Sequence, residues 1–204
     1  MKHNSIIIKG LVLTSMCVFL LLNSCKEDKQ SKQEKEVEKE VSVKSEPFFE
    51  LSLAQWSMHK MIFEQNVDPY TFAEKAKGWG FTGLEYVSGL YNKELEKSNF
   101  SKEAIDLFVA KSNAESKKHG MKNLLIMIDG QGDLAASDKK ERQSAVENHY
   151  KWVDAAAAMG CHSIRVNLAG SKNPEEWIAN SVDGLTQLAN YAKTKNINVI
   201  VENH

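Results

Sequence analysis

The chain has 204 residues, with 26 lysines and arginines against 27 aspartates and glutamates, so its formal net charge is −1. The basic residues form no stripe in the body of the chain, which excludes nucleic acid as the default partner. Of the three cysteines, Cys17 and Cys25 lie near the N-terminus. Cys161 therefore stands alone, which excludes a disulfide framework and predicts a small buried side chain rather than a nucleophile.

Residues 1–24 have the pattern of a bacterial secretory signal. Lysines precede an apolar run at residues 10–22, which has the length of a signal h-region and is short for a membrane-spanning helix. The sequence Leu-Asn-Ser-Cys follows and resembles a bacterial lipobox, in which the cysteine is diacylated and becomes the new N-terminus. We therefore expect a lipoprotein signal peptide over residues 1–24 and a lipid on Cys25.

Residues 25–46 are dominated by lysine and glutamate. Such a composition cannot bury enough apolar surface to offset the entropy lost on ordering, so we expect a flexible tether; a short helix with Glu–Lys pairs is the alternative. The sequence Lys-Glu-Asp at residues 26–28 is similar to a signal that sends lipoproteins to the cell surface in some Gram-negative bacteria. The expected location is the outer membrane or cell surface of a Gram-negative bacterium, with the membrane as a partner through the lipid.

From residue 47 onward, apolar strand-like runs alternate with longer amphipathic helical patterns. The runs lie at residues 51–56, 83–87, 121–128, 163–168 and 199–202. Strands that alternate with helices in this way favour a parallel sheet with crossover helices.

Capping residues mark where the helices are expected to begin and end. Asp68 and Asn173 each stand before a proline at a first helical position, and Asp138 is followed by a glutamate at capping-box spacing. Gly120 and Gly160 stand where helices are expected to end.

We expect an α/β fold in which residues 47–204 form the N-terminal part of a (β/α)₈ TIM barrel, with parallel strands and truncated after the fifth strand. A complete barrel of this kind takes about 250 residues. The alternative is a five-stranded doubly wound domain. In either case the first and fifth strands would be bare edges, and the residues at the strand ends favour the barrel.

Strand residues alternate between two faces. In the last run, Val199 and Val201 are expected to meet the helices, which turns Glu202 and His204 toward the barrel mouth. Because an inward charge must be paired, solvated or bound to metal, Glu202 is the strongest candidate for a functional residue.

The same alternation turns Arg165 and Asn167 inward in the fourth strand, and Glu85 and Asp129 take similar positions in the second and third. Polar residues at the carboxyl ends of barrel strands are typical of active sites. Three of them have structural alternatives. Glu85 could pair with Arg165 or Lys122, and Asp129, which precedes a glycine, could form a turn. Asn167 could cap a loop.

Four segments together resemble the sugar phosphate isomerase/epimerase family, which has a xylose-isomerase-like barrel. They lie at residues 51–60, 83–88, 149–170 and 199–204. The resemblance implies that Glu202 is the first ligand of a divalent metal ion (Mn, Mg, Zn or Co) and a candidate for proton transfer. It places the remaining ligands on later strands, beyond residue 204, so the 204 residues alone are expected to lack a complete site.

The activity that the resemblance implies is isomerisation or epimerisation of a sugar or keto-sugar through an enediolate, which a metal ion on the carbonyl stabilises. Asn167 and His204 would contact sugar hydroxyls, with Glu85 a further candidate. Trp56 and His59 would wall the pocket, with a place in the core as the alternative for Trp56.

Two alternatives use the same barrel. One is a metal-dependent lyase or dehydratase of keto-sugars, and the other is a surface lipoprotein that binds sugar without turning it over. A related nuclease branch is disfavoured because the sequence shows neither a basic groove nor histidine-rich strand ends. The sequence is compatible with an oligomer.

Overall fold

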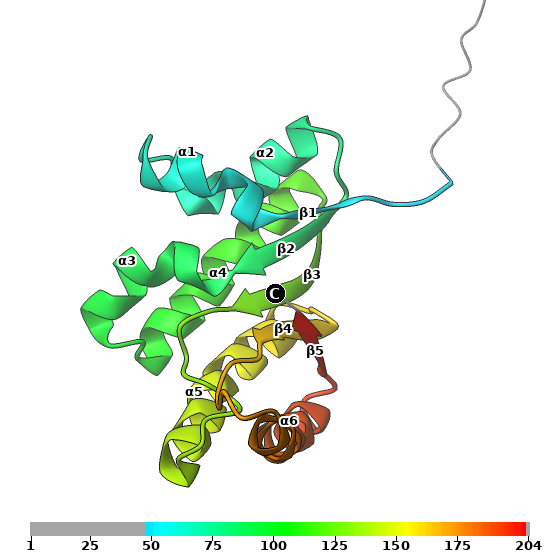
Figure 1. Ribbon diagram of the computed structural model, residues 1–204. Coiled ribbons are helices and arrows are strands. Elements are labelled where there is room, and N and C mark those ends of the chain that lie inside the picture. Colours follow the sequence, from blue (N-terminus) through cyan, green and yellow to red (C-terminus); the bar gives the residue numbers. More distant parts are fainter. Residues whose placement is uncertain (1–47, 203–204) are drawn as a thin grey trace, which may run out of the picture. The chain divides into compact units, whose positions relative to one another are not determined.

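The computed structural model describes residues 48–202, which form a curved parallel sheet with helices on its outer side (Figure 1). Within this range the five strands lie in the order β1-β2-β3-β4-β5, and each pairs in parallel with the next. Their bounds are β1 Ser52–Ala54, β2 Gly83–Val87, β3 Lys122–Ile128, β4 Ser163–Asn167 and β5 Asn198–Glu202. The sequential order confirms the predicted partial barrel, because a doubly wound sheet reverses its strand order at a switch point.

Four sequence predictions lie outside the described residues: the signal over residues 1–24, the tether over 25–46, the lipid site at Cys25 and the site residue His204. None of the helices within residues 48–202 combines the length and the apolar character that a membrane crossing requires.

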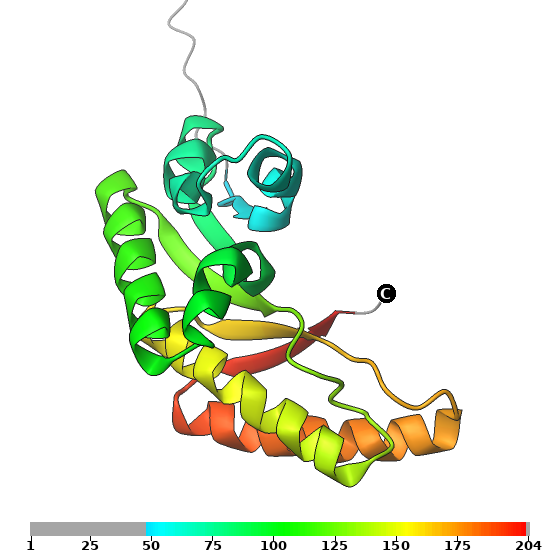
Figure 2. The same cartoon turned by 90° about the vertical axis from the view of Figure 1, so that its left-hand side faces the viewer.

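A long helix lies between each later pair of strands, whereas the segment between β1 and β2 contains only short helices. Figure 2 shows α4, α5 and α6 on the outer side of the curved sheet. The α-helices are α1 His59–Phe63, α2 Phe72–Gly78, α3 Asn92–Leu95, α4 Lys102–His119, α5 Lys139–Ala158 and α6 Pro174–Thr194. The 3₁₀ helices are η1 Gln55–Met58, η2 Pro69–Thr71, η3 Ser88–Tyr91 and η4 Glu96–Ser98.

The predicted caps are present. The Asn173 side chain accepts hydrogen bonds from the backbone N–H groups of Glu175 and Glu176, at 3.0 and 3.2 Å, at the start of α6. Asp138 caps α5 in the same way. Asp68 caps η2 rather than a long helix, because α2 begins one 3₁₀ turn later. At the end of α4, Gly120 has the left-handed conformation that the sequence pattern predicts, with φ of 63°.

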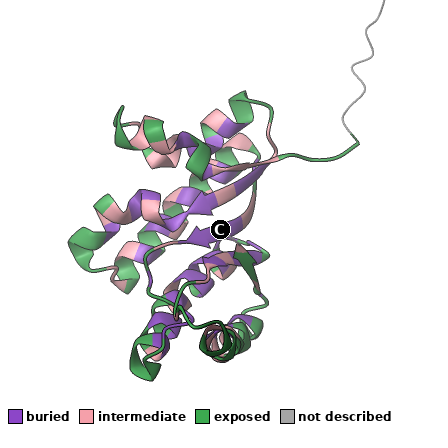
Figure 3. Cartoon of the chain, in the orientation of Figure 1, coloured by how far each residue is buried: buried purple, intermediate pink, exposed green. Residues whose placement is uncertain are grey.

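The core lies between the outer face of the sheet and the helices (Figure 3). Ile126 of β3, Ile164 of β4 and Trp152 of α5 have no solvent exposure at all. Cys161 is buried among them, and its burial raises the pKa of the thiol to about 12. A thiol with that pKa does not ionise near neutral pH, so Cys161 is a packed side chain and not a nucleophile.

Two strand predictions need correction. The first run was expected over residues 51–56, but β1 ends at Ala54 because Gln55 turns inward to begin η1. The buried Gln55 side chain accepts a hydrogen bond from the Val87 N–H at 3.1 Å and donates one to the Tyr91 hydroxyl at 2.8 Å.

The second correction concerns β5. Val199 packs on the core as expected, but Val201 is 45% exposed.

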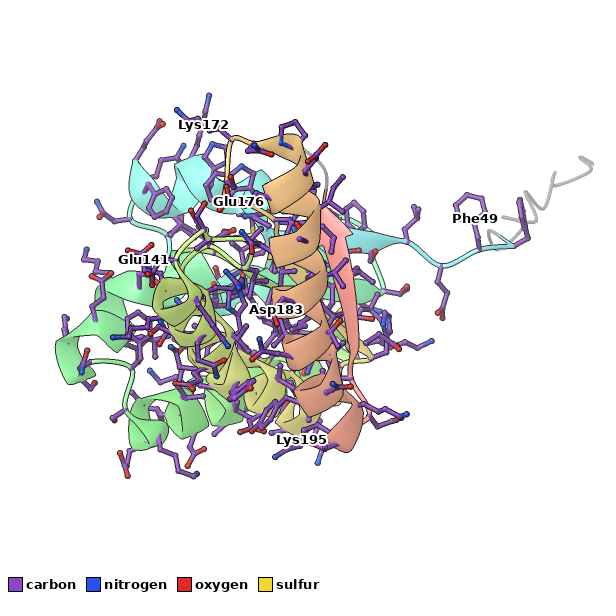
Figure 4. All side chains as sticks on the ribbon, turned by 60° about the horizontal axis from the view of Figure 1, so that its bottom comes forward. Phe49, Glu141, Lys172, Glu176, Asp183 and Lys195 are labelled. Atoms are coloured by element: carbon purple, nitrogen blue, oxygen red, sulfur yellow. The ribbon has the colours of Figure 1, made fainter. Side chains whose placement is uncertain are left out.

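The loop between β3 and α5 packs tightly on the segments around it. Arg142 is buried, and its guanidinium donates hydrogen bonds to the Ala136 carbonyl at 2.5 Å and to Asp183 at 2.7 Å. Figure 4 labels Asp183 on α6, at the side that faces α5. A Cβ atom added at Gly184 would lie 2.0 Å from the Leu134 carbonyl oxygen, so only glycine fits at this contact.

We predict that Gly184→Ala destabilises the protein by about 1–3 kcal/mol, the usual range for overpacking, although alanine is the better helix former. The free energy of unfolding in urea, followed by circular dichroism, measures this. The matched control is Gly78→Ala, because a Cβ at this helical glycine would meet nothing within 4 Å. Equal stability of the two variants would contradict the close contact.

We also predict that stability depends on the protonation of His149, which is buried on α5. Burial lowers the pKa of His149, although the hydrogen bond from its ring to the Ala145 carbonyl acts in the opposite direction. Below pH about 6.5 the unfolded chain therefore binds a proton that the folded chain does not. The protein should lose stability as the pH falls through this window, and His149→Phe should lose less between pH 7.5 and 5.5.

Urea unfolding of both proteins at the two pH values measures the difference. The control is His162→Gln, which removes an exposed histidine. The same pH dependence in the protein and in His149→Phe would show that this imidazole is not responsible.

Candidate active site at the carboxyl ends of the strands

A cavity of about 710 Å³ lies at the carboxyl ends of the strands, on the inner side of the sheet. Every strand or the segment directly after it contributes to the wall. The polar and aromatic lining residues are Trp56, Ser57, His59, Asp129, Arg165, Asn167 and Glu202. Parallel strands end at the same edge of a sheet, which is why side chains so far apart in the sequence meet here.

The register between β4 and β5 sets the position of Glu202. Asn167 lies directly opposite Glu202, and Arg165 lies opposite Ile200. Because alternate residues share a face, Arg165, Asn167 and Glu202 all point into the cavity, as the sequence analysis predicted.

Glu202 forms an ion pair with Arg165, through Oε2 and Nη1. The Arg165 side chain is only 20% exposed and that of Glu202 37%, so the pair is partly shielded from water. The buried Nε of Arg165 has no hydrogen-bond partner within the described residues. Arg165 therefore compensates the inward charge of Glu202 and fixes the direction of its carboxylate.

Asp129 and Asn167 form a second polar contact in the cavity wall. The Asn167 side-chain Nδ2 donates a hydrogen bond to Asp129 Oδ1 at 2.8 Å, and the Asp129 backbone N–H donates one to Ser88 Oγ at 2.9 Å. Ser88 is fully buried. Asp129 does begin a turn, since Gly130 follows with φ of 72°, but its carboxylate also orients the amide of Asn167.

The structure places Glu85 outside the cavity. It lies two residues before the end of β2, deeper along the inner face, and accepts a hydrogen bond from Ser52 Oγ at 2.5 Å. Neither alternative partner that the sequence suggested is used, because Arg165 pairs with Glu202 and Lys122 pairs with Glu50 at 2.7 Å. Glu85 is therefore not brought together with the other predicted site residues.

Trp56 and His59 form an aromatic wall of the cavity. Their rings are stacked, with centroids 4.7 Å apart and planes at 7°. Trp56 is 50% exposed, so it is not a core residue. Both predicted wall residues thus lie where the sequence analysis expected them.

Sequence reasoning assigned no site role to Arg165, although the alternation in β4 already pointed it inward. The signal that could have found it is the pairing rule for buried charges: an inward arginine beside an inward glutamate on the next strand predicts an ion pair. His204, the remaining predicted site residue, lies outside the described residues.

The described residues do not form a complete metal site. Within residues 48–202, no three histidine, cysteine, aspartate or glutamate side chains come close enough together to hold a metal ion. The Glu202 carboxylate has the right chemistry for one ligand of a divalent cation, but one such ligand alone does not bind a metal ion specifically.

Comparisons with known proteins agree with this fold. No curated protein matches the chain significantly. A solved D-psicose 3-epimerase in the presence of D-fructose aligns with a TM-score of 0.57 and 17% identity, over 76% of this chain and 55% of the other. The IOLI protein with a bound zinc atom aligns with a TM-score of 0.55 and 14% identity, over 75% and 51% of the two chains.

A third solved structure is the 3-keto-D-glucoside 4-epimerase YcjR from E. coli, in its apo form. It aligns with a TM-score of 0.50 and 14% identity, over 65% of this chain and 49% of the other. The chain thus spans about half the length of the solved structures that it matches. At these identities the likeness shows the fold.

The family model described as the xylose isomerase-like TIM barrel matches residues 73–204, which include four of the described strands and the whole of the polar wall from Asp129 to Glu202. With more than half of its residues matched, the chain belongs to the xylose isomerase-like TIM barrel family.

Proposed function

We propose that this protein is a carbohydrate isomerase or epimerase. The observation that carries the proposal is the position of Glu202, which projects from the end of β5 into a cavity walled by Asn167 and Trp56. A carboxylate, an amide and an aromatic ring are suited to a proton transfer, to hydrogen bonds with hydroxyls and to contact with a sugar ring. The solved epimerases of D-psicose and of a 3-keto-D-glucoside share this fold and support a sugar as the substrate.

We further propose that the reaction uses a divalent metal ion, of which the IOLI structure with zinc is a precedent in this fold. Glu202 would supply one ligand, and the described residues hold no complete set. When bound, such an ion would act as a Lewis acid and would stabilise negative charge that develops on a substrate carbonyl oxygen.

The residues of this chain would act around that centre. Arg165 holds one oxygen of the Glu202 carboxylate, which limits its rotation and keeps it directed into the cavity. Asp129 accepts from the Asn167 amide, which leaves the orientation of that amide fixed for a sugar hydroxyl. Trp56 offers the face of its ring to the apolar C–H side of the sugar. In this arrangement Glu202 is also the candidate to take and return the proton.

The predicted location remains a proposal as well. The lipobox-like sequence that ends at Cys25 supports an exported lipoprotein, anchored by its lipid in the outer membrane or at the cell surface of a Gram-negative bacterium.

The proposed function is tested with the protein in the full length in which its organism makes it, loaded with Mn²⁺ in D₂O. We expect deuterium to appear at the carbon beside the carbonyl of D-fructose, D-psicose or a 3-keto-glucoside, as followed by NMR. Glu202→Gln should lower the exchange rate at least about a hundredfold, because the amide can neither transfer the proton nor bind the cation as strongly. It should also lower the bound metal, measured by mass spectrometry.

The control is Glu50→Gln, which removes an ion-paired carboxylate outside the cavity and should leave both readouts unchanged. Sugar binding without hydrogen–deuterium exchange would contradict the proposed enzymatic activity and favour a sugar-binding protein. Unchanged metal content in Glu202→Gln would contradict its role as a ligand.

A second prediction concerns the contact between Asp129 and Asn167. Asn167→Asp replaces the donor by a second carboxylate at hydrogen-bond distance from the first. At pH 7 we expect it to destabilise the protein by about 1–3 kcal/mol, and by more than Asn167→Ala does. At pH 4.5 the gap between the two variants should narrow, because one carboxyl takes up a proton. Thermal unfolding at both pH values measures this, and a gap that does not change with pH would show that the two side chains do not interact.

A further inference from the structure

A second cavity, of about 510 Å³, lies between the segment after β1 and the segment after β2. Its apolar wall includes Ile62 and Phe63 from α1 and Leu90 from η3. Its polar lining includes Asn66, Asn92 and Lys93. Both contributing segments follow the carboxyl ends of their strands (Figure 1). The residues that line this cavity therefore belong to the same end of the sheet as the candidate active site.

The two cavities are direct neighbours. Trp56 lines the first and Phe63 the second, and these rings meet edge to face with centroids 6.4 Å apart and planes at 73°. On the other side, Gly89 of the second cavity lies against Asp129 of the first: a Cβ at Gly89 would be 3.7 Å from the Asp129 carboxylate. A ligand that lies against Trp56 can therefore extend to Phe63.

The back wall of the second cavity is held in place by buried contacts. Tyr91 is 1% exposed, and Gln55 ties it to the chain after β1 by donating to the Tyr91 hydroxyl at 2.8 Å and to the Pro69 carbonyl at 3.1 Å. Glu94, at the rim, pairs with Lys111 of α4 at 2.7 Å. A wall fixed in this way is formed before a ligand arrives, which lowers the entropy cost of binding.

Two features of the lining point to a ligand with both apolar and hydroxyl groups. Phe63 is 58% exposed, and α1, which carries it, has no buried residue, so this aromatic face is not part of the core. The Asn66 and Lys93 side chains, which also line the cavity, are exposed. Exposed amide and ammonium groups can form hydrogen bonds with hydroxyls, and a sugar carries hydroxyls on a ring with an apolar face.

We propose that the second cavity binds the neighbouring ring of a glycoside whose reacting ring lies against Trp56. This inference rests on the proposed function and narrows it: the preferred substrate is a sugar linked to a second ring rather than a free monosaccharide. Phe63 stacks on the second ring, and Asn66 or Lys93 forms a hydrogen bond with one of its hydroxyls.

The test compares D-fructose with three of its glycosides, lactulose, maltulose and isomaltulose, by isothermal titration calorimetry on the full-length protein loaded with metal. At least one glycoside should bind about tenfold more tightly than D-fructose, as expected when a further ring covers exposed aromatic surface. Phe63→Ala should remove that gain and leave the affinity for D-fructose within about twofold. Phe63→Tyr, which keeps the ring, should retain the gain.

The matched control is Phe49→Ala, because Phe49 is also half exposed and lies ahead of β1, apart from both cavities (Figure 4). It should change neither affinity. Equal affinities for D-fructose and all three glycosides would overturn the glycoside subsite and leave the proposed function standing. The same conclusion would follow if Phe63→Ala lowered the affinity for D-fructose and for the glycosides by the same factor. Binding of no sugar at all would overturn the proposed function together with this inference.

Discussion

The ion pair between Arg165 and Glu202 is the interaction on which the arrangement of the cavity depends. Both charges point to the inner side of the sheet because the apolar residues that alternate with Arg165 in β4 must face the helices. Removing a charge partly from water is unfavourable unless an opposite charge lies close to it, so Arg165 and Glu202 stabilise each other at this position. With this pair formed, the parallel register sets Asn167 beside Glu202, and Asp129 then fixes the Asn167 amide.

Much of the fold could be predicted because it depends on local signals. The alternation of strands and helices gave the parallel order, and Asn173 and Asp138 marked helix starts through hydrogen bonds that reach only two or three residues ahead. The end of β1 could not be predicted, because Gln55 leaves the strand to bond Val87 and Tyr91, which lie more than thirty residues away. The exposure of Val201 depends on what covers the sheet, and alternation alone does not contain that information.

In the candidate site, too, features that depend on a single strand could be predicted, and features that depend on distant contacts could not. Strand alternation was sufficient to point Asn167 and Glu202 into the cavity, since each needs only its own strand. It also pointed Glu85 inward, but depth along the strand decides whether a side chain reaches the cavity, and Glu85 bonds Ser52 below it. The second cavity is formed by two separate connecting segments. The sequence alone therefore could not place the exposed ring of Phe63 in a cavity wall, because the wall exists only when both segments are folded.

The close contacts at Gly170 and Gly184 have a mechanical consequence. Ala135 and Leu134 press their carbonyl groups against these glycines, and Arg142 ties the same loop to α6. The loop after β3 is therefore tightly packed on both sides. A side chain larger than hydrogen at either glycine would have to displace this loop, which begins directly after Asp129. A change at Gly170 or Gly184 would thus reach the cavity wall without altering any of its polar lining residues.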